Sequence, residues 1–409
     1  MTAARMSELR TSLIGALLVS LGPISMALYT PAMPELVHAF GTTESLIKLT
    51  LSLYFGGFAL AQLVAGTLSD AWGRRKVTLI FMAIYLAGSL MAALAPTVEV
   101  LLAGRLVQGI GASAGMTVAR AIVRDQFTGD RAAGIMNLIG MMLAIGPALS
   151  PTIGGIALGL FGWQSIFLIM VVFGAAACMI SAVSLRETIV PDPAMLRVKP
   201  ILLAYREVLT DLRFIAGTLV VGGAVGALYT QATILPFILI GTVGMTPAEF
   251  GMGMLMQSGM FLAGTMVVRQ GMKRFSSRQM ILPGLVLIGL ASAMLALSIF
   301  FWEPSYLSVM VPVGVYAFGI AFVNPYMMTA AIEPFPHIAG TASALMGFVQ
   351  MGSGVVGGII CAAIGKPVLA MGTVIPAFGV VCILSYIVYV IAVRAAPEPR
   401  SVGEPLAAE

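Results

Sequence analysis

The sequence predicts an all-α membrane protein in which twelve transmembrane helices form two six-helix bundles. The first observation is composition: of 409 residues, 59% are hydrophobic and only 10% are charged, whereas a soluble domain averages about 25% charged residues. The second is that twelve apolar segments have the length of about 20 residues that a helix needs to cross a bilayer. The third is a polar interval near the middle of the chain, which divides these segments six and six.

The twelve segments follow one another with short polar loops between them. They span approximately residues 12–34, 45–68, 77–96, 99–124, 133–159, 164–185, 214–240, 248–268, 280–302, 305–331, 339–364 and 370–393. Arg5 and Arg10 precede the first segment, as they would in a signal peptide. Because this segment is too long and lacks an Ala-x-Ala cleavage pattern, we interpret it as a retained helix.

Lysine and arginine indicate the orientation, because short cytoplasmic loops of membrane proteins carry an excess of them. With a cytoplasmic N-terminus, 19 of the 22 Lys and Arg residues fall on the cytoplasmic side. Lys48 and Lys366 then fall on the outer side, and Arg105 lies within the membrane. The opposite orientation would place the 19 outside. We therefore expect both termini in the cytoplasm.

The polar interval sets the expected domain boundaries. Residues 1–186 would form the N-terminal bundle, 187–213 a cytoplasmic linker, 214–394 the C-terminal bundle and 395–409 a disordered, proline-containing tail. Within the linker, residues 201–212 are either an amphipathic helix on the inner membrane surface, with its charged residues facing water, or a solvated connection.

Two loops repeat at an offset of 198 residues. Gly66, Thr67, Gly73 and the pair Arg75-Lys76 correspond to Gly264, Thr265, Gly271 and the pair Lys273-Arg274, whereas Asp70 is replaced by Val268. Corresponding loops in two six-helix halves are typical of a two-bundle transporter.

Arg105 is the Lys or Arg that lies furthest from the ends of an apolar segment. A charge there costs about 2.5–3.5 kcal/mol on insertion scales, so such residues usually face a polar cavity or a partner. Gln108 is on the same helix face. Gly104, Gly109, Gly111 and Gly115 leave one side nearly bare for close helix packing. The alternative is an arginine that only ties down neighbouring backbone carbonyls.

Two further motifs stand out. Gly66-x-Leu68-x-Asp70-x-x-Gly73-Arg74-Arg75-Lys76 predicts a short cytoplasmic turn in which Gly73 permits an unusual backbone and the basic residues stay at the inner surface. The fifth segment contains Gly146-Pro147, Pro151 and Gly154-Gly155. These prolines remove backbone donors and the glycines permit close contact, which predicts either a bending element or a kinked packing helix.

The loop motif resembles the signature of the major facilitator superfamily, and the proline motif resembles the antiporter signature of its drug exporters. Together with Arg105-x-x-Gln108-Gly109, Tyr29-Thr-Pro31, residues 62–75 and residues 339–350, the whole chain looks like the bicyclomycin- and chloramphenicol-resistance efflux subfamily. This resemblance implies a two-bundle fold, alternating access and export against proton entry. It also implies a latch of Gly66, Asp70, Gly73, Arg74, Arg75 and Asp125, in which Asp70 faces the start of the eleventh helix near Ala339 and Asp125 pairs with Arg74 or Arg75.

One departure from the subfamily concerns coupling. Where the subfamily commonly carries an Asp, two residues before Tyr29, this chain has Ala27. No Asp or Glu lies in the middle of any segment, and a carboxylate is the usual proton-coupling group. Either coupling has moved to an acid near a segment end, such as Glu35, or it is weak or absent. Arg105 also lacks a counter-ion, so an anionic or electron-rich substrate group would meet it directly.

The candidate cavity residues are the polar or amphipathic ones within predicted helices, where a lipid-facing position would be unfavourable. They are Tyr29, Arg105, Gln108, Asn137, Tyr229, Gln231, Asn324 and Tyr326. The alternative for each is a hydrogen bond between helices, worth about 0.6 kcal/mol on average.

These features predict a bacterial inner-membrane exporter of small organic compounds, of the multidrug type, that works by proton antiport. The alternatives are a proton-independent facilitator or exporter of an anionic metabolite, and a non-transporting membrane sensor, which would be expected to carry a soluble output domain. Paired catalytic groups and nucleotide-binding loops are absent, so we expect no enzyme activity. We expect no cofactor, no metal site and no nucleic-acid partner, and a monomer in the lipid bilayer.

Overall fold

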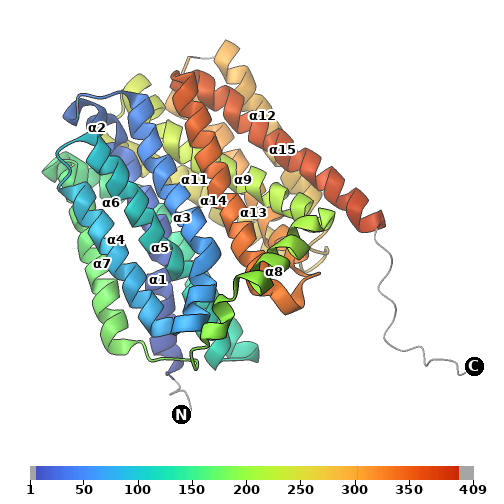
Figure 1. The fold of residues 1–409 in the computed structure, drawn as a ribbon. Helices are drawn as coiled ribbons and strands as arrows, with labels where there is room; N and C mark the ends of the chain where they lie inside the picture. Colours follow the sequence, from blue (N-terminus) through green and yellow to red (C-terminus); the bar gives the residue numbers. More distant parts are fainter. Residues whose placement is uncertain (1–5, 302, 396–409) are drawn as a thin grey trace, which may run out of the picture.

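The computed structural model describes residues 6–301 and 303–395, and within these ranges it contains helices and no strands. Twelve helices in these ranges are long and apolar enough to cross a membrane, which confirms the predicted fold class. The predicted disordered tail, from residue 396 onward, lies outside the described residues. Figure 1 shows the spanning helices of the first half lying beside those of the second half.

The first half of the chain supplies six spans. The first is a helix, α1, that continues through a short 3-10 turn into α2. The elements are α1 (Glu8–Tyr29), η1 (Thr30–Ala32), α2 (Met33–Ala39), α3 (Glu44–Trp72), α4 (Arg74–Ala93), α5 (Val98–Gln126), α6 (Gly129–Phe161) and α7 (Gln164–Ser184). Gly73, at φ 95°, separates α3 from α4 in a backbone conformation that other residues rarely adopt.

The second half begins with a connecting segment and then supplies six more spans. The elements are η2 (Pro193–Leu196), α8 (Val198–Thr210), α9 (Leu212–Pro236), the π-helical η3 (Phe237–Thr242), α10 (Pro247–Gly253), α11 (Leu255–Gly271), α12 (Ile281–Phe301), α13 (Tyr306–Ile332), η4 (Pro336–Ile338), α14 (Ala339–Ile364) and α15 (Pro367–Ala395). Thr246 and Ser305 start α10 and α13 with capping boxes, which satisfy the first free N–H groups of these helices.

Each half has its own apolar core, and the sequence repeat corresponds to equivalent packing. A Cβ added at Gly66 of α3 would lie 3.2 Å from Thr117 of α5. The equivalent Gly264 of α11 faces α13, where an added Cβ would lie 2.8 Å from the Phe318 carbonyl oxygen. The second and fourth spanning helices are therefore in close contact in each half.

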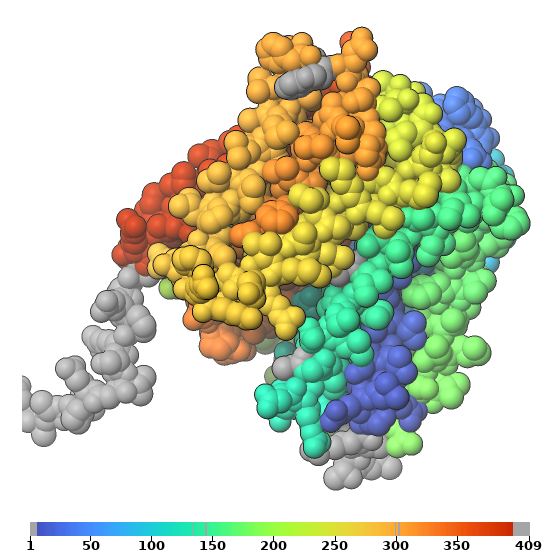
Figure 2. All heavy atoms as spheres, turned by 180° about the vertical axis from the view of Figure 1, so that it is seen from behind, coloured from blue at the N-terminus to red at the C-terminus, as the bar shows by residue number. Residues whose placement is uncertain are grey.

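We call the end of the bundle that carries residues 70–76 and the start of α1 the basic end, and the other the opposite end. At the opposite end α6 and α10 are in contact, since Thr152 Oγ1 donates to the Gly251 carbonyl at 2.9 Å. Figure 2 shows α6 and the helix that follows α10, α11, touching in their upper parts and diverging toward the basic end, with a hollow between them. The two halves are thus closed at the opposite end and open at the basic end on this side.

The connecting segment contains the helix α8, in the region where the sequence allowed either an amphipathic helix or a solvated linker. One face of α8 packs onto both halves: Val208 is fully buried, and the Tyr205 hydroxyl donates to the Leu63 carbonyl of α3 at 2.8 Å. Its charged face carries Glu207, 2.9 Å from His337 near the start of α14. The helix therefore bridges the halves at the basic end, on the side away from the hollow (Figure 1).

Candidate functional site

Arg105 lies at the centre of the N-terminal half, fully buried on α5. Its guanidinium is between the rings of Tyr29 on α1 and Tyr54 on α3, with its central carbon 4.3 Å from each ring centroid. Cation–π contacts of this kind are worth about 2 kcal/mol or more when desolvated. The two rings therefore hold the charge where the sequence predicted a polar site.

A hydrogen-bond network fixes the orientation of this cluster. Arg105 Nη1 donates to Gln108 Oε1, and Gln108 Nε2 donates to Ser89 Oγ at 2.8 Å. The Tyr29 hydroxyl shares a hydrogen bond of 2.6 Å with Thr50. The Tyr54 hydroxyl donates to a backbone carbonyl of α1 at 2.9 Å. With so many partners the rings cannot turn freely, so the site is rigid within this half.

The charge of Arg105 is not neutralised by an acid. Its Nε and Nη2 groups donate to no acceptor among the residues that the structure describes, and no carboxylate there forms an ion pair with it. Arg105 does not tie down backbone carbonyls, because its partners among the described residues are a side-chain amide and two rings. A buried donor without a partner is costly, so this guanidinium is well suited to an acceptor group of a ligand.

The glycines around Arg105 allow close packing, but not on a single side as the sequence suggested. A Cβ at Gly109 would meet the Tyr54 carbonyl of α3, one at Gly111 would meet the backbone of α4, and one at Gly115 would meet the backbone of α1. At 3.6 residues per turn, Gly109 and Gly111 lie on nearly opposite faces of α5, so the helical spacing itself already separates these two packing partners. The glycines bring three helices against α5, which closes the cage around the guanidinium.

The predicted cavity residues of the C-terminal half lie at different depths, with Gln231 near the opposite end of α9 and the other two near the basic end of α13. Gln231 on α9 is buried and accepts a hydrogen bond of 2.7 Å from Gln257 on α11. The Asn324 Oδ1 atom on α13 is buried without a partner among the described residues. Tyr326 is half-buried on the same helix. This half therefore presents amides and a phenol rather than charge.

Two more of the predicted residues lie apart from the Arg105 cluster. Tyr229 is at the contact between the halves, where its ring centroid is 5.0 Å from that of Phe55 on α3. Asn137 is exposed on α6. The eight predicted cavity residues thus do not form one continuous cluster. Tyr29, Arg105 and Gln108 form one cluster, and the other five lie at separate places in the bundle.

Small residues make the closure at the opposite end. A Cβ added at Gly155 of α6 would meet the Pro247 carbonyl of α10, and one at Gly251 of α10 would meet the Pro151 carbonyl of α6. On the other side of the bundle, Ser45 of α3 donates to the Ala362 carbonyl of α14 at 2.7 Å. Backbone approaches this close are possible only without side chains, so the glycines determine how tightly the two halves meet.

Lys48 belongs to this closure and is buried within it rather than lying in an exposed loop. It lies one turn inside α3 and is fully buried, with Nζ 2.9 Å from Glu44 and 4.6 Å from the ring centroid of Phe237 in the C-terminal half. A lysine one turn from a segment end looks like a loop charge in a hydropathy count. The Phe237 ring that covers it comes from a distant part of the chain, so nothing in the sequence indicates that this lysine is buried.

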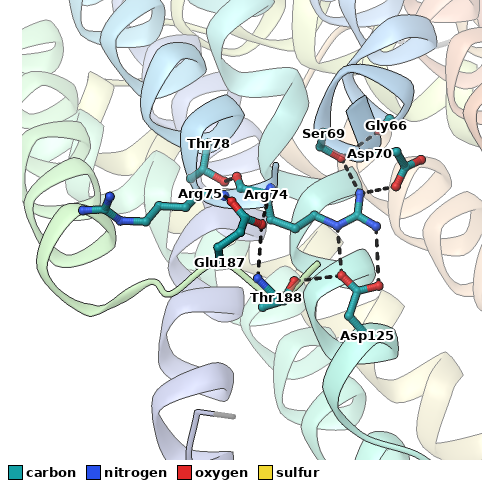
Figure 3. A network of polar contacts seen from close by, with 9 residues as sticks. All are labelled: Gly66, Ser69, Asp70, Arg74, Arg75, Thr78, Asp125, Glu187 and Thr188. Carbon is teal, nitrogen blue, oxygen red and sulfur yellow. Dashed lines mark hydrogen bonds and ion pairs between the residues drawn. The ribbon is translucent and has the colours of Figure 1, made fainter. Parts of the chain in front are cut away.

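The predicted latch residues form an ion-pair network at the basic end (Figure 3). Arg74 is between two acids: Nη1 is 2.5 Å from Asp70 and Nε donates to Asp125 at 2.9 Å. Nη1 also donates to Ser69 Oγ at 2.6 Å. The structure therefore pairs Asp125 with Arg74 rather than with Arg75, whose guanidinium points away and donates to the Ala182 carbonyl.

Glu187 completes this network and was not singled out in the sequence. Its carboxylate accepts from the backbone N–H groups of Arg74 and Arg75, at 2.8 and 3.2 Å. These are free N–H groups at the start of α4, where an acidic group is favourable. The same carboxylate lies against Gly73, where an added Cβ would meet it. Glycine at this position thus provides both the positive φ and the space for the acid.

Asp70 is engaged within its own half in this state. Besides Arg74, its backbone carbonyl accepts from the Asp192 N–H at 3.2 Å, and its side chain is 40% exposed. Among the described residues, those of α14 form no hydrogen bond or ion pair with Asp70. The expected contact with the start of α14 near Ala339 stays a prediction for another state.

The proline motif lies within one continuous helix, α6, rather than at a break. Gly146 and Gly154 face α1 of the same half, where a Cβ at Gly154 would meet the Leu28 carbonyl, whereas Gly155 faces α10 of the other half. Glu35, the predicted coupling residue, lies half-buried on α2, next to the backbone of Trp163. It is near the opposite end of the first span, away from the Arg105 cluster.

Two repeated halves of six spanning helices, each with buried polar groups and joined by glycine contacts at one end, define a two-bundle membrane transporter. Residues 15–358 match the Major Facilitator Superfamily. The chain belongs to this family and is a transporter rather than an enzyme.

Relatives and solved structures are similar over most of the chain. An uncharacterized MFS-type transporter, YdgK of Bacillus subtilis, is 29% identical over 346 residues, covering 83% of this chain and 85% of the relative. The multidrug resistance protein MdtL of Escherichia fergusonii is 29% identical over 334 residues, covering 82% and 83%. The fold is similar to a crystal structure of the peptide transporter POT in complex with alafosfalin, with a TM-score of 0.75, 15% identity and 94% coverage of both chains. It is also similar to a bacterial homologue of the human lysosomal transporter Spinster in an inward-facing and occupied conformation, with a TM-score of 0.72, 17% identity and coverage of 94% and 96%.

Proposed function

We propose that this protein exports small organic compounds across the bacterial inner membrane by alternating access, in exchange for protons. The observation that carries the proposal is that the halves meet at the opposite end and diverge at the basic end (Figure 2). The excess of Lys and Arg supports a cytoplasmic basic end and cytoplasmic termini. A hollow on that side is where an exporter takes up its substrate.

The proposed cycle follows from the two closures. To release substrate outside, α6 and α10 separate at Gly155 and Gly251 while the basic end closes. Asp70 then leaves Arg74 and faces the start of α14, where the free N–H groups of the helix favour a carboxylate. Asp125 keeps the Arg74 charge paired during this exchange.

The substrate class is proposed from relatives and from chemistry. A relative that bears the name of a multidrug resistance protein supports export of varied organic compounds, in line with the resemblance to the bicyclomycin- and chloramphenicol-resistance subfamily. The domain division at residues 187–213 is part of the same proposal, because each half has its own core. The proposed unit is a monomer.

Coupling to protons is proposed to involve Glu35, the acid that is half-buried on the first span. The test is transport by purified protein in liposomes with an imposed pH gradient, using neutral, cationic and anionic compounds. We expect uptake into liposomes that are acidic inside, and its loss on adding an uncoupler. Glu35→Gln should then retain equilibration but lose accumulation, whereas Glu303→Gln, at an exposed loop acid, should accumulate normally.

A proton-independent facilitator or exporter of an anionic metabolite is the second candidate, and a specific observation favours it. Arg105 is a fully buried cation without an acidic partner among the described residues. Movement that only equilibrates an anionic compound, whatever the pH gradient, would select this candidate. Arg105→Lys tests the contact, because an ammonium cannot form two parallel hydrogen bonds. We expect transport of an anion to fall at least about tenfold, and normal transport would exclude a two-point contact.

A further inference from the structure

An apolar groove lies on the surface of the C-terminal half, away from the Arg105 cluster. The helices α12 and α15 are in contact where Gly379 meets Ser292, and they form a groove of about 680 Å³ toward the basic end. This volume is within the range of about 300–1,000 Å³ that is typical of ligand sites. We propose that the groove binds one acyl chain of an anionic phospholipid, with the phosphate held by Arg394 and Arg278.

The lining of the groove suits a hydrocarbon chain. Its walls carry exposed branched side chains, such as Leu282 and Val286 on α12 and Ile387 on α15, and its floor includes Gly289 and Ala293. The small floor residues provide depth, and the branched walls provide apolar contact area. An apolar chain therefore gains contacts on three sides instead of one.

The length of the groove matches one leaflet. From residue 282 to residue 293, α12 rises about 17 Å at 1.5 Å per residue. The hydrocarbon core of a bilayer is about 30 Å thick, so one leaflet supplies about 15 Å of acyl chain. Because residue 282 is one residue into α12 at the basic end, the groove belongs to the leaflet on that side.

The basic end of the groove carries groups that bind a phosphate. Arg394 is in the last turn of α15 and lines the groove, and Arg278 lies beside the hydroxyl of Tyr386, another lining residue. Neither arginine forms an ion pair with any residue in the described ranges; Glu333, which lies near Tyr389 at this corner, pairs with neither. Guanidinium groups match the geometry of phosphate oxygens, and basic pockets between spanning helices bind anionic headgroups. Two unpaired cations select an anionic lipid over a zwitterionic one.

The test compares lipids and matched variants by native mass spectrometry of the purified full-length protein, titrated with phosphatidylglycerol or phosphatidylethanolamine. We expect one phosphatidylglycerol to be retained preferentially. The double variant Arg278→Gln/Arg394→Gln should retain it about tenfold or more weakly, given about 1 kcal/mol for each basic residue near a lipid surface. Gly289→Leu should also lose it by filling the floor, since an added Cβ there makes only ordinary contact, 3.5 Å from Ile383.

The control is Arg269→Gln/Lys273→Gln, which removes two exposed charges from the same end, one on α11 and one in the turn that follows it. It should retain the lipid as the unaltered protein does. Equal retention of both lipids, or equal loss in the control variant, would overturn the proposal. So would a mass of two chains that Gly289→Leu abolishes, because the groove would then bind a second copy. None of these outcomes depends on the transport direction proposed above.

Discussion

The closure at the opposite end predicts that one glycine controls the balance between the two access states. A Cβ at Gly155 would meet the backbone of α10 in the state described here, and a backbone cannot move aside as a flexible side chain does. Gly155→Val should therefore disfavour this state and leave the alternative state, with the opposite end open, unaffected. Overpacking of this kind costs about 1–3 kcal/mol.

This cost translates into a measurable change in populations. A difference of about 1–3 kcal/mol changes the ratio of two states about 5- to 150-fold. The matched control is Gly159→Val, one turn further along α6, where an added Cβ meets nothing within 4 Å. Both variants place the same β-branched residue in the same helix, so helix propensity cancels in the comparison.

The assay is double electron–electron resonance with spin labels at the opposite end, one in each half. Leu94 and Leu307 are suitable positions, because both side chains are exposed there. The three native cysteines, Cys178, Cys361 and Cys382, would first be replaced by alanine. We expect longer distances to dominate in Gly155→Val and the unaltered distribution in Gly159→Val. Identical distributions in the two folded variants would refute the closure by glycine contacts.

Three further predictions concern charged residues. Asp125→Asn should lower the free energy of unfolding by about 1.5–3 kcal/mol, because it removes charge-assisted hydrogen bonds from Arg74, whose side chain is only 4% exposed. The control Arg75→Gln, at an exposed residue, should cost less than about 1 kcal/mol. Equal losses in thermal unfolding would contradict the network. Lys48→Met should leave the stability unchanged or raise it, because it removes a buried ammonium whose acid partner is 42% exposed. It should also favour the state that is closed at the opposite end, and so shorten the spin-label distances. A clear loss of stability would contradict this prediction. Asp211 lies outside the spans, and hydrogen bonds from the guanidinium two residues later hold its pKa below the usual range. Its stabilising effect should therefore be present above about pH 4 and be lost as the pH falls further. The melting temperatures of the unaltered protein and of Asp211→Asn should converge below that pH. A difference that stays constant with pH would exclude this role.

The sequence alone was sufficient for the number and the approximate limits of the spans. A bilayer offers no hydrogen-bond partners, so each apolar segment must satisfy its backbone within one helix, and segment length and composition decide the result. The sequence also identified Arg105 and Gln108 as one group, because residues three apart share a helix face. The ion pair between Arg74 and Asp125 could also be predicted from the sequence, because both residues lie at helix ends on the same side of the membrane.

Only the tertiary structure decided which helix each residue meets. Gly154 and Gly155 are neighbours in the chain, yet the first packs on α1 of its own half and the second on α10 of the other half. Lys48 is one turn from a loop, yet a ring from a distant helix buries it. Helical periodicity specifies the direction of a side chain around its own axis, whereas the partner in that direction depends on how all twelve helices pack. Closure, burial and pairing between the halves are therefore properties of the assembled bundle and not of any one segment.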